Sequence, residues 1–407
     1  MTNTSRFHII RRSAALAAAL LLLSACEMKV TNPGPILDAD LNNASAMPAL
    51  VNGMSGDLSV ALGGMTLRTG LASGELTESG NFADEGFFYN GTFTGLNANT
   101  DWANAQRARW TSETGLERMK TVLGSTFESN ADTPRAYLYA GFANRLLGEN
   151  MCTAVIDGGP AQSDTVYFQR ADSLFTRAYT LATALNNTNV KNAALGGRAS
   201  VRAWMGNWTA AVADASLVPS NFVFNAIYGT GTARENLYIA DQTITRKEVT
   251  VWGTYVATQP KTDPRTPWDT VKTGTAIAKG NDGKTNFFRQ LKYTSLGSPV
   301  PLVKGSEMLV LRAEAALRSG DIAGMTSLLN QARATYTGLS TLTAPTTTAA
   351  AWTMLQTERG AVNWLEARRL WDMRRWNAEG TNTFLNGRNM CVPVSDNEFA
   401  SNPNLRK

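Results

Sequence analysis

Histidine is almost absent from this sequence: the only one in 407 residues is His8, within the first 25. Catalytic pairs in which a serine or cysteine attacks the substrate need an imidazole as general base. Most catalytic zinc sites also include at least one imidazole ligand. The chain also lacks the glycine-rich loop that binds phosphates and the acidic loop of an EF-hand. These classes of site are therefore excluded, and we expect no metal and no other cofactor.

Charge is sparse as well, at 17% of residues, and the formal net charge is only +5. Three of the positive charges, Arg6, Arg11 and Arg12, lie in the first 25 residues, so residues 26–407 carry +2. No run of lysines and arginines is interleaved with aromatic residues, so we expect no nucleic-acid partner. The hydrophobic content of 43% is that of a globular protein.

Long apolar runs are also lacking, and the clearest apolar stretch lies near the start of the chain. It extends from Ala14 to Leu23, follows the three arginines, and is shorter than the roughly 20 residues needed to span a bilayer. It ends in Leu23-Ser24-Ala25-Cys26, which resembles the lipobox of bacterial lipoproteins, where the cysteine is lipidated. No later stretch reaches 18 apolar residues. We therefore expect membrane contact through a lipid anchor only.

This pattern predicts three parts of the chain. Residues 1–25 would be a lipoprotein signal peptide, residues 26–37 a lipidated N-terminus with a polar tether, and residues 38–407 the folded domain. The alternative is an ordinary signal peptide cut after Ala25, which would leave Cys26 unmodified. In either case the mature chain contains no histidine.

The sequence has three cysteines. If Cys26 carries lipid, Cys152 and Cys391 remain, which is an even number in an oxidising compartment. We predict that these two form a disulfide that closes a long loop. The alternative is two separate buried thiols.

Amphipathic helices in pairs are the main structural pattern. Leu174, Ala178, Leu181 and Leu185 have the spacing of a single helical stripe. The pattern of a helix, a glycine with Asn or Asp, and a second helix occurs at Gly206-Asn207 and again at Gly320-Asp321. These pairs look like tetratricopeptide-type hairpins, whose short helices bury their apolar stripes by stacking on neighbours. We therefore expect a mainly α-helical fold with a few short strands.

Two stretches, residues 79–104 and 219–300, lack this periodicity and are expected to be long, loop-rich insertions. Both combine aromatic rings with polar residues, which suits the apolar and hydroxyl-bearing faces of a sugar. Alternatively, the rings pack the loops onto the helices. The ligand-binding candidates are Phe87, Phe88, Tyr89, Trp102, Trp252, Tyr255 and Trp268.

Four segments resemble motifs of the SusD/RagB family of nutrient-uptake lipoproteins, in the family's order. They are Cys26 with Val30-Thr31-Asn32-Pro33; Asp263-Pro264-Arg265; Arg312-Ala313-Glu314-Ala315 with Gly320-Asp321 and Leu329-Asn330-Gln331-Ala332-Arg333; and Glu358-Arg359 to Trp376 with Pro393-Val394, Glu398 and Asn402-Pro403-Asn404-Leu405. The charged residues of the fourth segment are interpreted as ion pairs that stabilise the scaffold. A ligand or partner surface is the alternative.

The resemblance implies tetratricopeptide-like helical hairpins that carry an irregular ligand-binding face. It also implies an outer-membrane lipoprotein, facing the cell surface, that captures oligosaccharides or peptides for a SusC-like TonB-dependent transporter. It further implies that the protein is not an enzyme. An alternative function is a lipid-anchored helical-repeat scaffold that binds only proteins. A glycoside hydrolase would need two carboxylates at a set separation.

Overall fold

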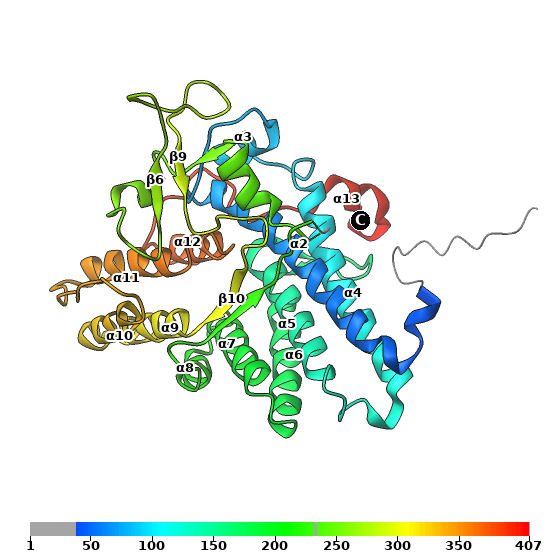
Figure 1. Cartoon of the computed structure of the whole chain (residues 1–407). Coiled ribbons are helices and arrows are strands. Elements are labelled where there is room, and N and C mark those ends of the chain that lie inside the picture. Colours follow the sequence, from blue (N-terminus) through cyan, green and yellow to red (C-terminus); the bar gives the residue numbers. More distant parts are fainter. Residues whose placement is uncertain (1–37, 232–233, 407) are drawn as a thin grey trace, which may run out of the picture. The chain divides into compact units, whose positions relative to one another are not determined.

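The computed structural model describes residues 38–231 and 234–406. The predicted signal peptide, Cys26 and the tether lie outside these residues. The chain divides into two compact units at residues 41 and 42. The described part of the first unit is the 3-10 helix η1 (Asp38–Leu41). All the other elements belong to the second unit, which is mainly α-helical, as predicted (Figure 1).

Two long helices form one side of the second unit. The helix α2 (Met47–Ala72), which follows η2 (Ala44–Ala46), is buried over most of its surface. It packs against α4 (Asn99–Leu123) and α5 (Thr133–Asn150). Glycines allow close packing: a Cβ atom on Gly115 would lie 2.3 Å from Met54 Cε. The largely buried α2 therefore supports the neighbouring helices.

The helices from α4 to α11 pack in a series in which each contacts the next. After α5 come α6 (Thr165–Ala184), α7 (Thr188–Trp204), α8 (Trp208–Ser216), α9 (Gly305–Arg318), α10 (Ile322–Ala334) and α11 (Thr348–Val362). Gly320 has a φ of +85°, and the Asp321 carboxylate accepts a hydrogen bond from the Gly324 N–H at 2.7 Å. The predicted helical hairpins are therefore confirmed, together with their turns.

The strands are short and pair in twos. They are β1 (Thr77–Glu78), β2 (Thr153–Ala154), β3 (Gln162–Ser163), β4 (Val223–Ala226), β5 (Val249–Thr250), β6 (Trp268–Thr270), β7 (Lys272–Thr273), β8 (Ala276–Ile277), β9 (Phe288–Gln290) and β10 (Val300–Lys304). Antiparallel pairs join β1 to β5, β2 to β3, β4 to β10, β6 to β9 and β7 to β8. In the first of these, Thr77 lies opposite Thr250. Next to it the Ser79 N–H donates a hydrogen bond to the Glu248 carbonyl at 2.8 Å, so the two loop-rich segments are connected directly.

Shorter helices complete the loop-rich part and the C-terminal region. They are α3 (Ala83–Asn90), η3 (Gly124–Thr126), the π-helix η4 (Leu237–Thr245), η5 (Tyr255–Thr258), α12 (Arg369–Ala378), α13 (Asp396–Ser401) and η6 (Pro403–Leu405). Residues 79–104 thus contain α3 and the first turn of α4, so they are more helical than expected. The helix α3 buries only two residues, Glu85 and Phe88. Two positions are too few to show the periodic apolar pattern by which a helix is recognised in a sequence. In Figure 1, α3, β6 and β9 lie together at one end of the helices.

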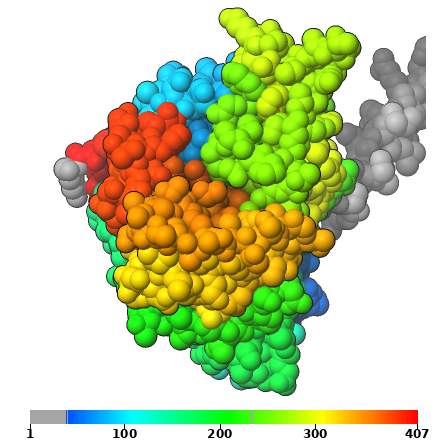
Figure 2. Space-filling view, turned by 90° about the vertical axis from the view of Figure 1, so that its left-hand side faces the viewer, coloured from blue at the N-terminus to red at the C-terminus, as the bar shows by residue number. Residues whose placement is uncertain are grey.

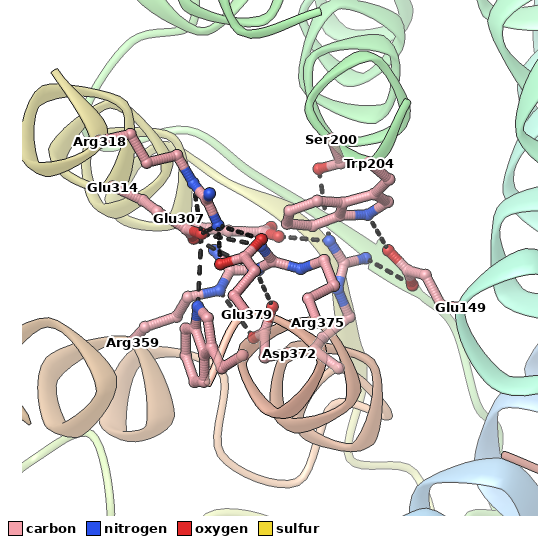
Figure 3. A network of polar contacts seen from close by, with 12 residues as sticks. Glu149, Ser200, Trp204, Glu307, Glu314, Arg318, Arg359, Asp372, Arg375 and Glu379 are labelled. Carbon is pink, nitrogen blue, oxygen red and sulfur yellow. Dashed lines mark hydrogen bonds and ion pairs between the residues drawn. The ribbon is translucent and has the colours of Figure 1, made fainter. Parts of the chain in front are cut away.

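A buried network of ion pairs fixes α12 against the neighbouring helices (Figure 3). The Arg375 guanidinium lies 2.7 Å from Glu314 on α9 and 2.8 Å from Asp372 on its own helix. Arg368 bonds Glu307 at 2.5 Å. The side chains of these pairs are at most 9% exposed. The predicted ion pairs are therefore present. Arg374, Arg375 and Glu379 also line a hollow of about 340 Å³, so the alternative of a ligand or partner surface stays a prediction.

The predicted disulfide is present between Cys152 and Cys391, which are 239 residues apart. Next to it, Met151 and Val392 form an isolated parallel bridge. The disulfide therefore ties the segment after α5 to the segment before α13. No helix of the described part of the chain is both long and apolar enough to cross a membrane.

Candidate functional site

A hollow of about 310 Å³ lies where five parts of the chain meet, and we call it the arginine pocket. Its walls come from the end of α2, from α3, from the segment after β5, from the start of α12 and from residues 384–388. The lining residues are Leu71, Ser73, Gly74, Leu76, Thr77, Tyr89, Asn90, Gly253, Thr254, Tyr255, Arg369, Phe384 and Arg388. In Figure 2 the blue, yellow-green and orange-red parts of the surface meet at a recess.

Two glycines with left-handed backbones shape the wall of the pocket. Gly74, just after α2, has a φ of +75°, and a Cβ atom there would lie 2.8 Å from Phe384 Cζ. Gly91 ends α3 with a φ of +69°, and a Cβ atom there would lie 2.7 Å from Arg388 Cβ. Any larger residue would be strained and would push these side chains away. The 384–388 segment can therefore close over the ends of α2 and α3.

Three aromatic rings line the pocket. Tyr89, on α3, and Phe384 are partly exposed, at 38% and 43%. The Tyr255 hydroxyl donates a hydrogen bond to the Gly360 carbonyl at 3.0 Å, which fixes its ring. Burial raises the pKa of Tyr255 well above its usual value, so this residue stays neutral.

Two arginines provide the charge of the pocket. Arg369 Nε donates to the Ser73 carbonyl at 3.2 Å, and its guanidinium lies 3.8 Å from the centre of the Tyr255 ring. Arg388 Nη2 donates to the Ala72 carbonyl at 3.4 Å and to the Tyr89 carbonyl. Within residues 38–231 and 234–406, neither arginine forms an ion pair with a carboxylate. Burial lowers the pKa of Arg388 from its usual value.

One carboxyl group, Glu75, lies behind the lining. Its side chain is fully buried, and Oε1 accepts a hydrogen bond from the Leu365 N–H at 3.0 Å, whereas Oε2 has no partner. Burial raises the pKa of Glu75 to about 7, although the nearby positive charges of Arg369 and Lys292 oppose this shift. Glu75 is therefore partly protonated at neutral pH.

The structure brings together only some of the predicted ligand-binding residues. Tyr89 and Tyr255 line the pocket. Phe87 and Trp252 are exposed, at 46% and 40%; along the chain Trp252 is adjacent to the lining residue Gly253, and Phe87 is two residues from Tyr89. Both therefore remain predictions.

The other three candidates, Phe88, Trp102 and Trp268, pack inside the protein, which is the alternative given for these rings in the sequence analysis. Phe88 is stacked on Phe93 with ring centres 4.2 Å apart, and Trp268 on Phe288 at 4.8 Å. These two rings and Trp102 are almost completely buried, so their faces are not accessible to a solute in this conformation.

Sequence reasoning missed Arg369, Phe384 and Arg388. The one local signal was the concentration of Gly, Asn and Thr over residues 379–389, which is typical of a loop. The motif Asp263-Pro264-Arg265 lies outside the arginine pocket. Arg265 forms ion pairs with Asp263 at 2.7 Å and with Glu358 at 2.5 Å, and so holds its loop against α11. The described residues contain no cluster of His, Cys, Asp and Glu that could hold a metal ion.

Comparisons with known proteins agree with this architecture. Residues 224–406 match the model of the SusD family. A SusD superfamily protein from Bacteroides vulgatus ATCC 8482 superposes with a TM-score of 0.70 at 16% identity, covering 89% of this chain and 97% of that one. A SusD superfamily protein from Bacteroides thetaiotaomicron VPI-5482 gives 0.66 at 12% identity, with 89% and 98% covered.

A further solved structure is a SusD-like carbohydrate binding protein from Bacteroides vulgatus ATCC 8482. It superposes with a TM-score of 0.62 at 16% identity, and the match covers 81% of this chain and 83% of that one. At such identities these structures are similar to this chain in fold. No curated protein sequence matches the chain significantly.

Proposed function

We infer, from the premise that this chain is a SusD/RagB-like protein, that it captures a saccharide at the arginine pocket for uptake into the cell. The observation that carries this proposal is the joining of two loop-rich segments and residues 384–388 around one hollow lined by Tyr89, Tyr255 and Phe384. The aromatic faces suit the apolar faces of sugar rings, and the backbone and polar groups suit their hydroxyls.

The pocket has the size and the rigid support that binding of a small solute needs. Its volume of about 310 Å³ lies at the lower end of the range of roughly 300–1,000 Å³ that is usual for ligand pockets. We therefore propose that it holds one end of an oligosaccharide while the rest extends into solvent. The helices beneath it, fixed by buried ion pairs, provide a surface that does not have to be ordered on binding.

The lining also supports binding without catalysis. Hydrolysis of a glycosidic bond requires two carboxyl groups on either side of that bond. No Asp or Glu lines this pocket, and Glu75 lies behind its wall. We therefore propose that the protein releases its ligand unchanged.

A screen of oligosaccharides by isothermal titration calorimetry tests this function. We expect micromolar to millimolar binding of at least one saccharide class, weakened at least tenfold by Tyr89→Ala and by Phe384→Ala. Trp110→Ala is the matched control, since Trp110 is 55% exposed and lies outside this pocket. Binding that the two pocket variants leave unchanged would contradict the proposed site. The absence of binding to every saccharide would favour the protein-binding scaffold.

We further propose that Cys26 anchors the protein by its lipid to the outer membrane, facing the cell surface, and that its partner is a SusC-like TonB-dependent transporter. The sequence resemblance supports both. Metabolic labelling with a fatty acid, compared between the native chain and Cys26→Ser, tests the anchor. Affinity purification from membranes tests the partner: a large β-barrel protein should copurify, and its absence would count against the uptake role.

A further inference from the structure

The two charged side chains that line the arginine pocket are both positive. Arg369 and Arg388 reach it from α12 and from the segment that follows it. Other hollows in the described residues combine charges of both signs. A hollow of about 520 Å³ is lined by Arg265 and Arg333, and both arginines are paired with carboxylates, namely Asp263 and Glu358. The arginine pocket is therefore unusual in this molecule because its arginines lack counter-charges.

Backbone carbonyls accept some of the hydrogen bonds of Arg369 and Arg388 but neutralise little of their positive charge. The carbonyls of Ala72 and Ser73, at the end of α2, accept hydrogen bonds from Arg388 and Arg369. A helix C-terminus carries about half an elementary negative charge, against two full positive charges here. Arg388 Nε is also buried without a hydrogen-bond partner in the described residues. Arg388 Nε thus has no acceptor, and the positive charges of Arg369 and Arg388 are only partly compensated.

Glu75 does not supply the missing charge. It forms no ion pair with either arginine among the described residues, and its carboxyl group is buried beside Lys292 as well as Arg369. Because it is partly protonated at neutral pH, it offsets Arg369 only in part. The wall of the pocket therefore stays electropositive.

Each guanidinium also lies over an aromatic ring, and only part of its edge is used by the backbone carbonyls. Arg369 is 3.8 Å from the centre of the Tyr255 ring, and Arg388 is 5.2 Å from that of Phe384. Stacking of this kind holds the plane of the guanidinium and directs its N–H groups sideways. Carboxylate and sulfate oxygens match this planar set of donors.

We propose that the arginine pocket selects saccharides that carry a negative charge, as a uronic acid carboxylate or a sulfate ester, and that Arg369 and Arg388 bind this group. This inference rests on the proposed function and names the ligand class of the same site. The partly exposed rings of Tyr89 and Phe384 contact the sugar face, and the two arginines recognise the charge.

The test compares probes of equal length by titration calorimetry with the full chain. The probes are trigalacturonate, its methyl ester, neutral galactotriose and a sulfated galactotriose. We expect trigalacturonate or the sulfated sugar to bind at least tenfold more tightly than both neutral probes. The preference should shrink as salt is raised, because the attraction is electrostatic. The carboxylated and sulfated arms distinguish the two sources of charge.

Variants identify the groups responsible. Arg388→Gln should reduce the affinity for the charged probe at least tenfold more than it reduces the affinity for the neutral probes. Arg107→Gln is the matched control, because Arg107 lies on α4, is half-exposed and pairs with Asp57. If Arg388→Gln does not fold, the affinities of the native chain for trigalacturonate and for its methyl ester still test the charge selectivity.

Each possible result has a distinct meaning. Equal binding of charged and neutral probes would overturn the charge selectivity and leave the proposed function standing. Binding to no saccharide would overturn both. Tight binding of a peptide through its terminal carboxylate, without binding of sugars, would also overturn this inference.

Discussion

Glu314 is the centre of the buried ion-pair network, and its replacement by glutamine should be the most informative test of that network. Its side chain is fully buried on α9 and accepts hydrogen bonds from Arg375 at 2.7 Å, Arg318 at 2.8 Å and Trp376 Nε1 at 3.3 Å (Figure 3). The positive charges of Arg375, Arg359 and Arg318 outweigh burial and lower the pKa of Glu314 to about 2.

The magnitude follows from this pKa. A carboxyl group that titrates near 4.5 in the unfolded chain and near 2 in the folded protein contributes about 3 kcal/mol to the free energy of unfolding at neutral pH. Glu314→Gln keeps the size of the side chain but leaves Arg375 partly uncompensated. Removing one partner of a buried ion pair costs about 3–5 kcal/mol. We therefore expect a loss of about 3 kcal/mol at pH 7.

The pH dependence has a definite sign. Because the pKa of Glu314 is lowered on folding, its contribution is fully present above about pH 4.5 and is lost as the pH falls toward the folded value. The native protein should therefore lose stability between about pH 4.5 and 2. In Glu314→Gln this part of the acid limb should be flatter.

Urea denaturation followed by tryptophan fluorescence, at intervals from about pH 2 to 8, measures both effects. Glu379→Gln is the matched control: Glu379 accepts from the same Arg318 but is 38% exposed, so its loss should cost under about 1 kcal/mol. Equal losses in the two variants would refute the reasoning, as would an unchanged acid limb in Glu314→Gln.

Three further results are expected. Replacing both Cys152 and Cys391 by serine should lower the free energy of unfolding by about 3–5 kcal/mol, since the disulfide closes a long loop; thiol titration of the unfolded, unreduced protein should show neither of these cysteines free. Asp321→Ala should cost about 1 kcal/mol in urea denaturation, because the N-cap of α10 is lost, and Asp321→Asn should cost less. The affinity for a charged saccharide should rise as the pH falls through about 7, because protonated Glu75 leaves Arg369 uncompensated, and Glu75→Gln should remove this dependence.

Local patterns in the sequence were sufficient to predict the helical framework. A glycine followed by a capping residue ends one helix and begins the next whatever lies around it, as at Gly320-Asp321. Apolar spacing likewise predicts which stripe of a helix is buried. The disulfide followed from counting, since two cysteines remained once Cys26 was assigned to the lipid anchor.

The aromatic candidates show the limit of such reasoning. Tyr89 is exposed, whereas its neighbour Phe88 is fully buried, because successive residues on the helix α3 point in different directions. Composition could not distinguish the two, since α3 is only eight residues long. The same limit applied to Trp268, whose ring is covered by Phe288 from a paired strand.

The sequence by itself determined the paired helices and their turns, because each depends on neighbouring residues. It predicted the link between Cys152 and Cys391 from a count, and the structure places the two cysteines together. Only the tertiary structure decided where a solute could bind. Arg369 and Arg388 donate hydrogen bonds to the carbonyls of Ser73 and Ala72, which lie 296 and 316 residues earlier in the chain. Such proximity depends on how α2, α3 and α12 pack, and no pattern within any one segment specifies that packing.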